Sequence, residues 1–280
     1  VLFRSQIAPR LSELLKQPVI VENRAGASGT IAASAAAKAR PDGYTLLLGH
    51  VSSNAMVPAI TPKMPYAADK DFTAINLIGS VPQVVVVPAA SPARTLAEFI
   101  ALAKAKNGGL NYASSGVGTQ QHFAAEMFEL ATGTRMTHVP YKGSGAALAD
   151  LLSAQVDVNF DTVPTVLSHI KSGRLRPLAV TTRARVASLP GVPTAKSLGY
   201  DLVYPAPYGL AGPKGIPPAV VDRLYKAFKG AADSDEYKKL LVQLGQTEWQ
   251  KPPSEYQKWA GEFYVSERSL VERAKLLRQP

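Results

Sequence analysis

The chain contains no cysteine, and this absence removes several kinds of chemistry at once. Disulfide frameworks, thiolate nucleophiles and cysteine-ligated zinc or iron–sulfur sites are all excluded. No run of about 18 apolar residues occurs either, so the sequence predicts no membrane-spanning helix. Common catalytic signatures are missing too, because the sequence has no Walker loop, Gly-x-Ser-x-Gly elbow or His-Glu-x-x-His pair.

Histidine is scarce, and the few histidines show no metal-ligand spacing. His50, His122, His138 and His169 are far apart in the sequence, and a structural or surface role fits each better than a role as ligand or base. The sequence also lacks the three-glycine fingerprint of a dinucleotide site. We therefore expect no metal, no cofactor and no catalysis.

The formal net charge is +10, but Lys and Arg are scattered singly or in short pairs. A nucleic-acid groove normally clusters such residues, so we expect no nucleic-acid partner. The positive balance is typical of a solvated surface, with a smaller role in attracting an anionic ligand.

Strand-like and helix-like segments alternate along most of the chain. Predicted strands cover residues 19–21, 44–48, 83–87, 110–113, 156–160 and 177–181, and predicted helices cover residues 6–16, 31–39, 95–106, 120–132, 146–153 and 164–171. Short links between them favour an α/β fold of mostly parallel sheets flanked by helices. Such sheets bind ligands beyond the carboxyl ends of their strands.

Two extended segments divide the chain into two lobes. Prolines surround residues 83–88 and 204–210, and we expect these segments to be paired hinge strands. The first lobe is then discontinuous, with residues 1–86 and 206–280. Residues 87–205 form the second lobe.

A polar glycine loop between a predicted strand and a predicted helix is the best candidate for a ligand site. The candidate residues are Ser114, Ser115, Gly116, Gly118, Thr119 and Gln120. The glycines let a ligand approach the backbone, the hydroxyls can donate hydrogen bonds, and the helix N-terminus favours negative charge. An ordinary capped β–α turn explains the loop equally well. Residues 26–30, which include Ser28, and residues 142–145 are weaker versions of the same pattern.

Several ordered motifs resemble one family, the tripartite tricarboxylate transporter receptors, also called Bug proteins. The motifs are VENRAGASG (residues 21–29), PDGYTLL (41–47), YASSGVGT (112–119), HVPYKG (138–143), QVD (155–157), HIKSG (169–173) and LPGVPT (189–194). The similarity covers nearly everything after residue 6.

The resemblance implies a hinged, two-lobed periplasmic binding protein of type II that acts as a monomer. Such a receptor delivers a small carboxylate solute to membrane subunits of its transporter. In the family, backbone groups of two loops hold the ligand carboxylate, partly through water, and one of these loops matches residues 114–119.

Other positions match residues that line the cleft in the family. For each of them, a purely structural role is an alternative to ligand binding. Ser52 and Ser53 follow a predicted strand, and Asp161 and Thr162 follow another, where helix capping explains each pair equally well. An acid at Asp161 would suit an amino or hydroxyl group of the ligand. Tyr208 corresponds to an aromatic residue over the family's cleft, and hinge packing is its alternative.

Residues 1–5 read Val-Leu-Phe-Arg-Ser, which is what the end of a common sequencing adapter encodes. We expect a gene fragment that lacks the family's first strand and the second loop of its carboxylate clamp. Such a chain would expose strand edges, dissolve poorly and bind weakly. A missing signal peptide is then uninformative.

Two other functions stay open at this point. Glycine loops bind phosphates as readily as carboxylates, so an enzyme acting on a phosphate-bearing substrate is one alternative. A sensory receptor of the same fold that reports its ligand to a membrane kinase is the other.

Overall fold

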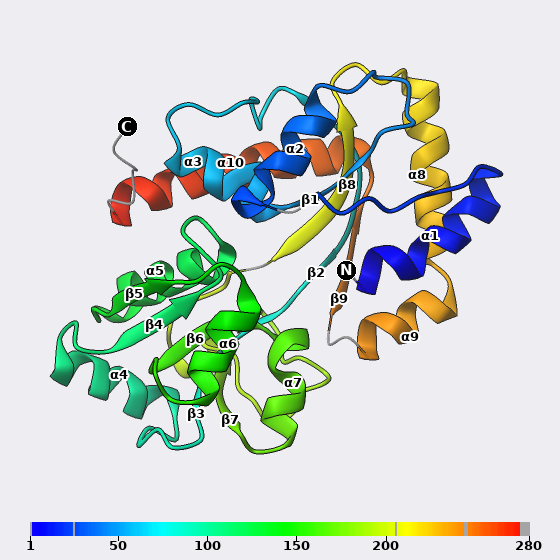
Figure 1. Ribbon diagram of the computed structural model, residues 1–280. Coiled ribbons are helices and arrows are strands. Elements are labelled where there is room, and N and C mark those ends of the chain that lie inside the picture. Colours follow the sequence, from blue (N-terminus) through cyan, green and yellow to red (C-terminus); the bar gives the residue numbers. More distant parts are fainter. Residues whose placement is uncertain (1, 25, 205, 244–245, 275–280) are drawn as a thin grey trace.

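The chain folds into two α/β lobes, each built on its own sheet, and the predicted two-lobed fold is confirmed (Figure 1). The structure is a computed structural model and describes residues 2–24, 26–204, 206–243 and 246–274.

The first lobe contains a four-stranded sheet of order β1-β8-β2-β9. Its strands are β1 (Leu47–His50), β8 (Pro207–Pro213), β2 (Phe72–Ser80) and β9 (Thr247–Lys251). All three pairings in this sheet are antiparallel. Helix α2 packs on β1 and β8, and helices α8 and α10 pack on β2.

The second lobe contains a five-stranded sheet of order β5-β4-β6-β3-β7. Its strands are β5 (Thr137–Pro140), β4 (Asn111–Ser114), β6 (Val158–Thr162), β3 (Gln83–Pro88) and β7 (Leu175–Val180). Strand β4 runs parallel to β5 and β6, whereas β3 is antiparallel to β6 and β7. Neither sheet is mostly parallel, because the strands next to the lobe crossings run against their neighbours.

Helices flank both sheets. They are α1 (Leu2–Leu15), α2 (Thr30–Ala37), α3 (Val57–Ile60), α4 (Leu96–Lys106), α5 (Gln120–Thr132), α6 (Ser144–Leu152), α7 (Val163–Lys171), α8 (Pro218–Ala232), α9 (Asp235–Gln243) and α10 (Pro253–Ala274), with short helical turns η1 (Ala27–Gly29), η2 (Ser52–Met56) and η3 (Lys196–Leu198). Helix α4 shows how local sequence signals set the two ends of a helix. Thr95 and Glu98 form the predicted capping box, and Asn107 ends the helix in a left-handed conformation.

Two expectations about strands are wrong. Residues 19–21 form no strand, and Ile20 is 86% exposed, while Val19 packs partly against the core under α1 and α8. The segments 83–88 and 204–210 do not pair, because β3 and β8 lie in different sheets. The short crossings themselves meet, because Val81 N donates to the Ala206 carbonyl at 2.9 Å.

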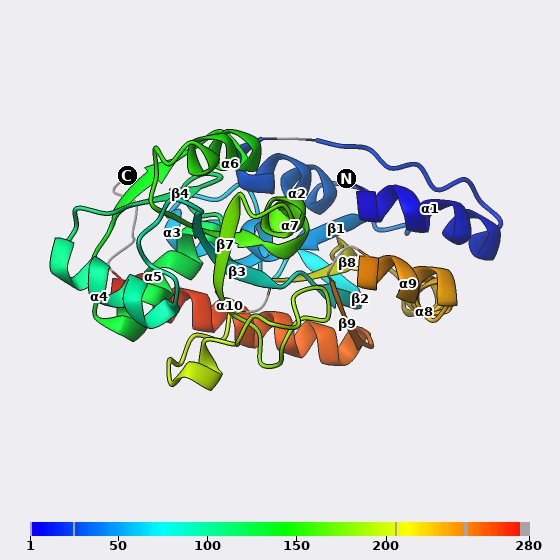
Figure 2. The same cartoon turned by 90° about the horizontal axis from the view of Figure 1, so that it is seen from below.

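The two lobes share part of one hydrophobic core. Met56 and Ile60 of the first lobe pack in the same cluster as Phe123 and Phe128 of α5, and Leu270 of α10 joins them. Figure 2 shows α10 running along one side of the molecule past both lobes. Because α10 contacts both β2 and α5, the start of α5 is positioned from both sides of the cleft.

Candidate functional site

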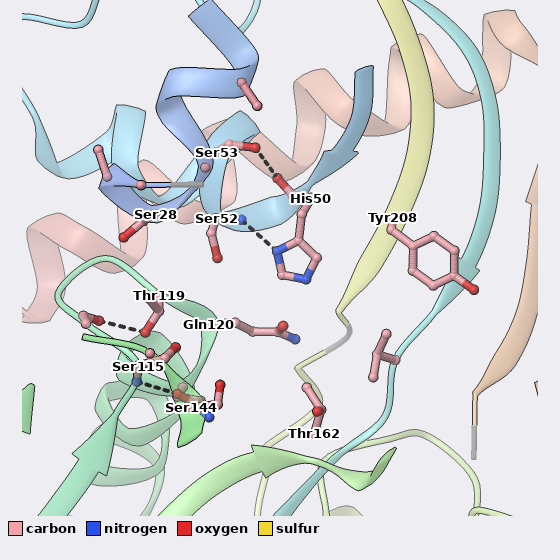
Figure 3. Close-up of a pocket in the computed structure, with 18 of the residues that line it drawn as sticks. Ser28, His50, Ser52, Ser53, Ser115, Thr119, Gln120, Ser144, Thr162 and Tyr208 are labelled. Atoms are coloured by element: carbon pink, nitrogen blue, oxygen red, sulfur yellow. Dashed lines mark hydrogen bonds between the residues drawn. The ribbon is translucent and has the colours of Figure 1, made fainter. Parts of the chain in front are cut away.

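A cleft of about 1090 Å³ lies between the lobes. Its walls come from η1 and the end of β1 in the first lobe, and from the loop before α5 and the end of β6 in the second (Figure 3). Strands β1, β4 and β6 therefore present their carboxyl ends to the cleft, where α/β sheets usually bind ligands. The volume is slightly above the usual range for small-molecule sites, which is about 300–1,000 Å³.

The loop from Ser114 to Thr119, here called the ligand loop, connects β4 to α5. Gly116 and Gly118 adopt φ values of 136° and 78°, which a residue with a side chain rarely adopts. Thr119 is the N-cap of α5, but its hydroxyl donates to the Gly116 carbonyl at 2.6 Å and does not cap the helix. The amides in the first turn of α5 therefore receive no acceptor from their N-cap side chain.

Most other amides of the ligand loop already have acceptors within the chain. Ser115 N donates to the Gln121 side chain, Gly116 N to Ser114 Oγ at 3.1 Å, and Gly118 N to His122 Nδ1 at 3.2 Å. This arrangement differs from the expectation that the loop amides themselves face a ligand. The donors best placed for an anion are the first-turn amides of α5 and the Ser115 hydroxyl.

The first lobe supplies polar groups opposite the ligand loop. Ser28 Oγ donates to the Val117 carbonyl at 3.5 Å, which joins the two walls. His50 lies at the end of β1, where its Nδ1 accepts from Ser52 N at 3.3 Å and its carbonyl accepts from Ser53 Oγ at 3.1 Å. Figure 3 shows the side chains of Ser28, His50 and Ser52 facing the ligand loop across the cleft, whereas the Ser53 hydroxyl points to the His50 carbonyl.

Asp161 lies at the end of β6, on the floor of the cleft, and is 1% exposed. Burial raises the pKa of its carboxyl to about 6, although hydrogen bonds from Thr162 N and Gln121 oppose the shift. Asn159 Nδ2 also donates to the carboxyl at 3.1 Å. Asp161 can therefore accept a hydrogen bond from a ligand when it is ionised and can donate one when it is protonated.

Cations stand near the mouth of the cleft. Arg24 and the exposed Lys142 are among the lining residues, and Arg24 pairs with Glu22 at 2.8 Å. The lining therefore combines two cations, Arg24 and Lys142, with the buried carboxyl of Asp161.

Tyr208 lies on β8, where its hydroxyl donates to Gln246 at 2.9 Å and burial raises the pKa of the phenol.

The structure brings most of the predicted site residues together. Ser28, Ser52, Ser53, Ser115, Gly116, Thr119, Gln120, Asp161, Thr162 and Tyr208 line the cleft. Ser114 and Gly118 lie behind its surface, because Ser114 is fully buried and Gly118 packs against Val57 and Ile60 of the first lobe. Sequence reasoning missed His50 and Gln121, and the rule that strand ends meet at the cleft could have indicated His50.

Neither a metal site nor a membrane span is found in the described ranges. Among these residues no group of three His, Asp or Glu side chains could hold a metal ion. In the same part of the chain no helix is both long and apolar enough to cross a bilayer.

The two lobes and the polar cleft between them are the arrangement of a periplasmic solute-binding protein. A family model described as "Tripartite tricarboxylate transporter family receptor" matches residues 2–276. The chain belongs to this family.

Named relatives share the sequence and the fold. Protein BugT of Bordetella pertussis is 36% identical over 265 residues, which cover 91% of this chain and 81% of BugT. An R. palustris protein solved with adipate is 30% identical, with a TM-score of 0.91 over 98% of this chain and 92% of its own. MatC from Rhodopseudomonas palustris, solved with bound malate, is 28% identical, with a TM-score of 0.87 over 96% of this chain and 93% of its own.

Proposed function

We propose that this chain is a periplasmic receptor that captures a small carboxylate and delivers it to the membrane subunits of a tripartite transporter. The observation that carries the proposal is the cleft itself. The N-terminus of α5, the Ser115 hydroxyl, and the Arg24 and Lys142 cations all border one cavity. Helix N-termini and cations both favour anions.

The ligand would bind with its carboxylate at the first turn of α5. Each charge-assisted hydrogen bond there contributes about 1.5–3 kcal/mol, and the helix dipole adds about 0.3–1 kcal/mol. Three such bonds are enough for an affinity near the micromolar range, which corresponds to about −8 kcal/mol. Recognition of this kind requires no reactive group, so we propose no catalysis.

Two relatives support the ligand class. One structure carries adipate and another carries malate, both small dicarboxylates, and both proteins share this fold over nearly the whole chain. Asp161, next to Gln121 on the floor of the cleft, adds a hydrogen-bonding group beside the start of α5. We therefore propose a dicarboxylate or a hydroxy- or amino-carboxylate as the solute.

Closure of the lobes around the ligand completes the proposed mechanism. We propose lobes formed by residues 1–86 with 206–280 and by residues 87–205, which rotate as a monomer about the two crossings. The short crossing between β2 and β3 and the Val81–Ala206 hydrogen bond support a hinge at this place. The hydrogen bond between Ser28 of one lobe and Val117 of the other already joins the two walls at one edge of the cleft.

A thermal-shift screen tests the function. The purified chain is heated with dicarboxylates, tricarboxylates, hydroxy acids, amino acids and phosphate esters, each at several concentrations. A ligand at 100 times its Kd stabilises the fold by about 2.7 kcal/mol, which raises the melting temperature by roughly 5–10 °C for a chain of this size. Stabilisation by phosphate esters alone, or by no carboxylate at all, would contradict the proposal.

A further inference from the structure

Two of the four histidines lie face to face directly behind the ligand loop. His122 is in the first turn of α5 and His138 is on β5, and their ring centroids are 4.2 Å apart with an interplanar angle of 9°. Tyr112 of β4 stacks on His138 at 4.7 Å. His122 is 5% exposed, so its ring belongs to the interior of the second lobe.

Each ring ends a chain of hydrogen bonds that begins at a glycine amide of the loop. Gly118 N donates to His122 Nδ1 at 3.2 Å. Gly116 N donates to Ser114 Oγ at 3.1 Å, and Ser114 Oγ lies 2.6 Å from His138 Nε2. The single proton of the Ser114 hydroxyl has two acceptors in reach, the Gly116 carbonyl at 3.1 Å and His138 Nε2 at 2.6 Å, and the ring takes it when the neutral His138 is unprotonated at Nε2. An unprotonated His122 Nδ1 is required for the Gly118 bond.

These acceptors matter because the loop backbone is unusual. Gly116 and Gly118 both adopt positive φ, and their amides point back into the lobe toward the rings. A buried amide without an acceptor is costly, so His122 stabilises the loop directly through the buried Gly118 amide. His138 acts through Ser114, because it orients the hydroxyl oxygen that accepts from Gly116 N. Both contacts favour the loop conformation that presents Ser115 and the start of α5 to the cleft.

We propose that the stacked imidazoles of His122 and His138 are positioning residues, which as neutral hydrogen-bond acceptors hold the ligand loop in its binding conformation. The inference rests on the proposed function, because it assigns to the pair a part in carboxylate binding.

Other titratable groups surround the pair. They are Tyr112 of β4, Glu126 and Glu129 of α5, and Asp161 of β6, which α5 covers. Glu126 lies 3.6 Å from His122 Nε2 and accepts from the Tyr112 hydroxyl at 2.8 Å. Burial raises the pKa of Glu126 and lowers the pKa of His138 to about 4, so His138 is neutral near pH 7.

Matched substitutions separate a hydrogen-bonding role from simple packing. The His122→Asn variant keeps an acceptor where Nδ1 stood, whereas His122→Leu fills a similar volume without one. The His138→Gln and His138→Leu variants form the same contrast at Nε2. Adipate and malate serve as probes, binding is measured by calorimetry, and amide hydrogen exchange of Gly116 and Gly118 is measured without ligand.

We expect the leucine variants to lose at least tenfold in affinity and to exchange the corresponding glycine amide faster, while the Asn and Gln variants stay within threefold of wild type. Leucine variants that bind and exchange like wild type would overturn the proposal, as would Asn and Gln variants that fail as the leucine variants do. Melting curves identify any variant that fails to fold. If one position yields an unfolded variant, the amide exchange of the two variants at the other histidine decides whether the proposal holds.

Amide exchange without ligand supplies a readout that does not depend on the ligand class. If wild type binds neither probe, the proposed ligand class fails, and the exchange of the glycine amides still reports whether the rings hold the loop.

Discussion

Gly118 offers the sharpest test of how the lobes meet. A Cβ at this position would lie 2.8 Å from Ile60 Cδ1 and 3.0 Å from Val57 Cγ2, both on the first lobe. For Gly118→Ala, the positive φ of 78° costs about 1–2 kcal/mol and the overpacking about 1–3 kcal/mol. We expect a total loss of about 2–5 kcal/mol in the free energy of unfolding, measured by urea titration.

Gly133 is the matched control at the other end of α5. Its φ is 65° and no atom lies within 4 Å of the place that a Cβ would take, so Gly133→Ala carries the backbone strain alone, about 1–2 kcal/mol. Calorimetry with adipate should show at least tenfold weaker binding for Gly118→Ala and less than twofold change for Gly133→Ala. Adding Ile60→Val to Gly118→Ala removes the nearest methyl group and should restore part of the loss. Equal destabilisation by the two alanine variants would refute the close approach.

Two further substitutions test the electrostatics. Glu267 accepts a hydrogen bond from Tyr204 at 2.7 Å, and burial raises the pKa of its carboxyl to about 7 from 4.5, so the native state binds its proton more tightly than the unfolded state. The free energy of unfolding of the wild type therefore falls as pH rises from about 4.5 to 7. The Glu267→Gln variant has no such proton, so its free energy of unfolding relative to wild type should rise by about 3 kcal/mol between pH 4.5 and pH 8 in urea titrations. A difference between the two proteins that does not change with pH would refute this. In stopped-flow measurements, Lys142→Gln should slow the association of adipate about two- to fivefold at low salt, and this effect should disappear at high salt. Lys104→Gln on α4 is the control and should leave the association rate unchanged at low salt.

The sequence predicted the elements around the ligand loop well, because their signals are local. Gly116 to Thr119 and Gly133 bracket the amphipathic helix α5, and the Thr95–Glu98 capping box starts α4 where it was expected. The strands after each loop are bounded in the same way by glycine and proline residues.

Strand direction could not be read in the same way. It depends on how the chain crosses between the lobes, and a crossing of two residues, Val81 and Pro82, carries no signal for whether β3 runs with or against β6. Residues 19–21 are apolar enough for a strand, but strand formation requires a neighbour in space, and no local pattern reports that.

The hydrogen-bond acceptors of the loop amides could not be predicted from the sequence either. Gln121 and His122 are local to the loop, but His138 reaches it from β5 across the sheet. A pattern of glycines and hydroxyls predicts donors at a helix N-terminus, whereas their acceptors depend on tertiary packing.

A crystal structure of the chain soaked with adipate or malate tests the central claim most directly. The account predicts a ligand carboxylate in the cleft with oxygens about 3 Å from the amide nitrogens of Gln120 and Gln121 and from the Ser115 hydroxyl. A ligand bound elsewhere, or a carboxylate in the cleft with its oxygens turned away from the start of α5, would contradict it.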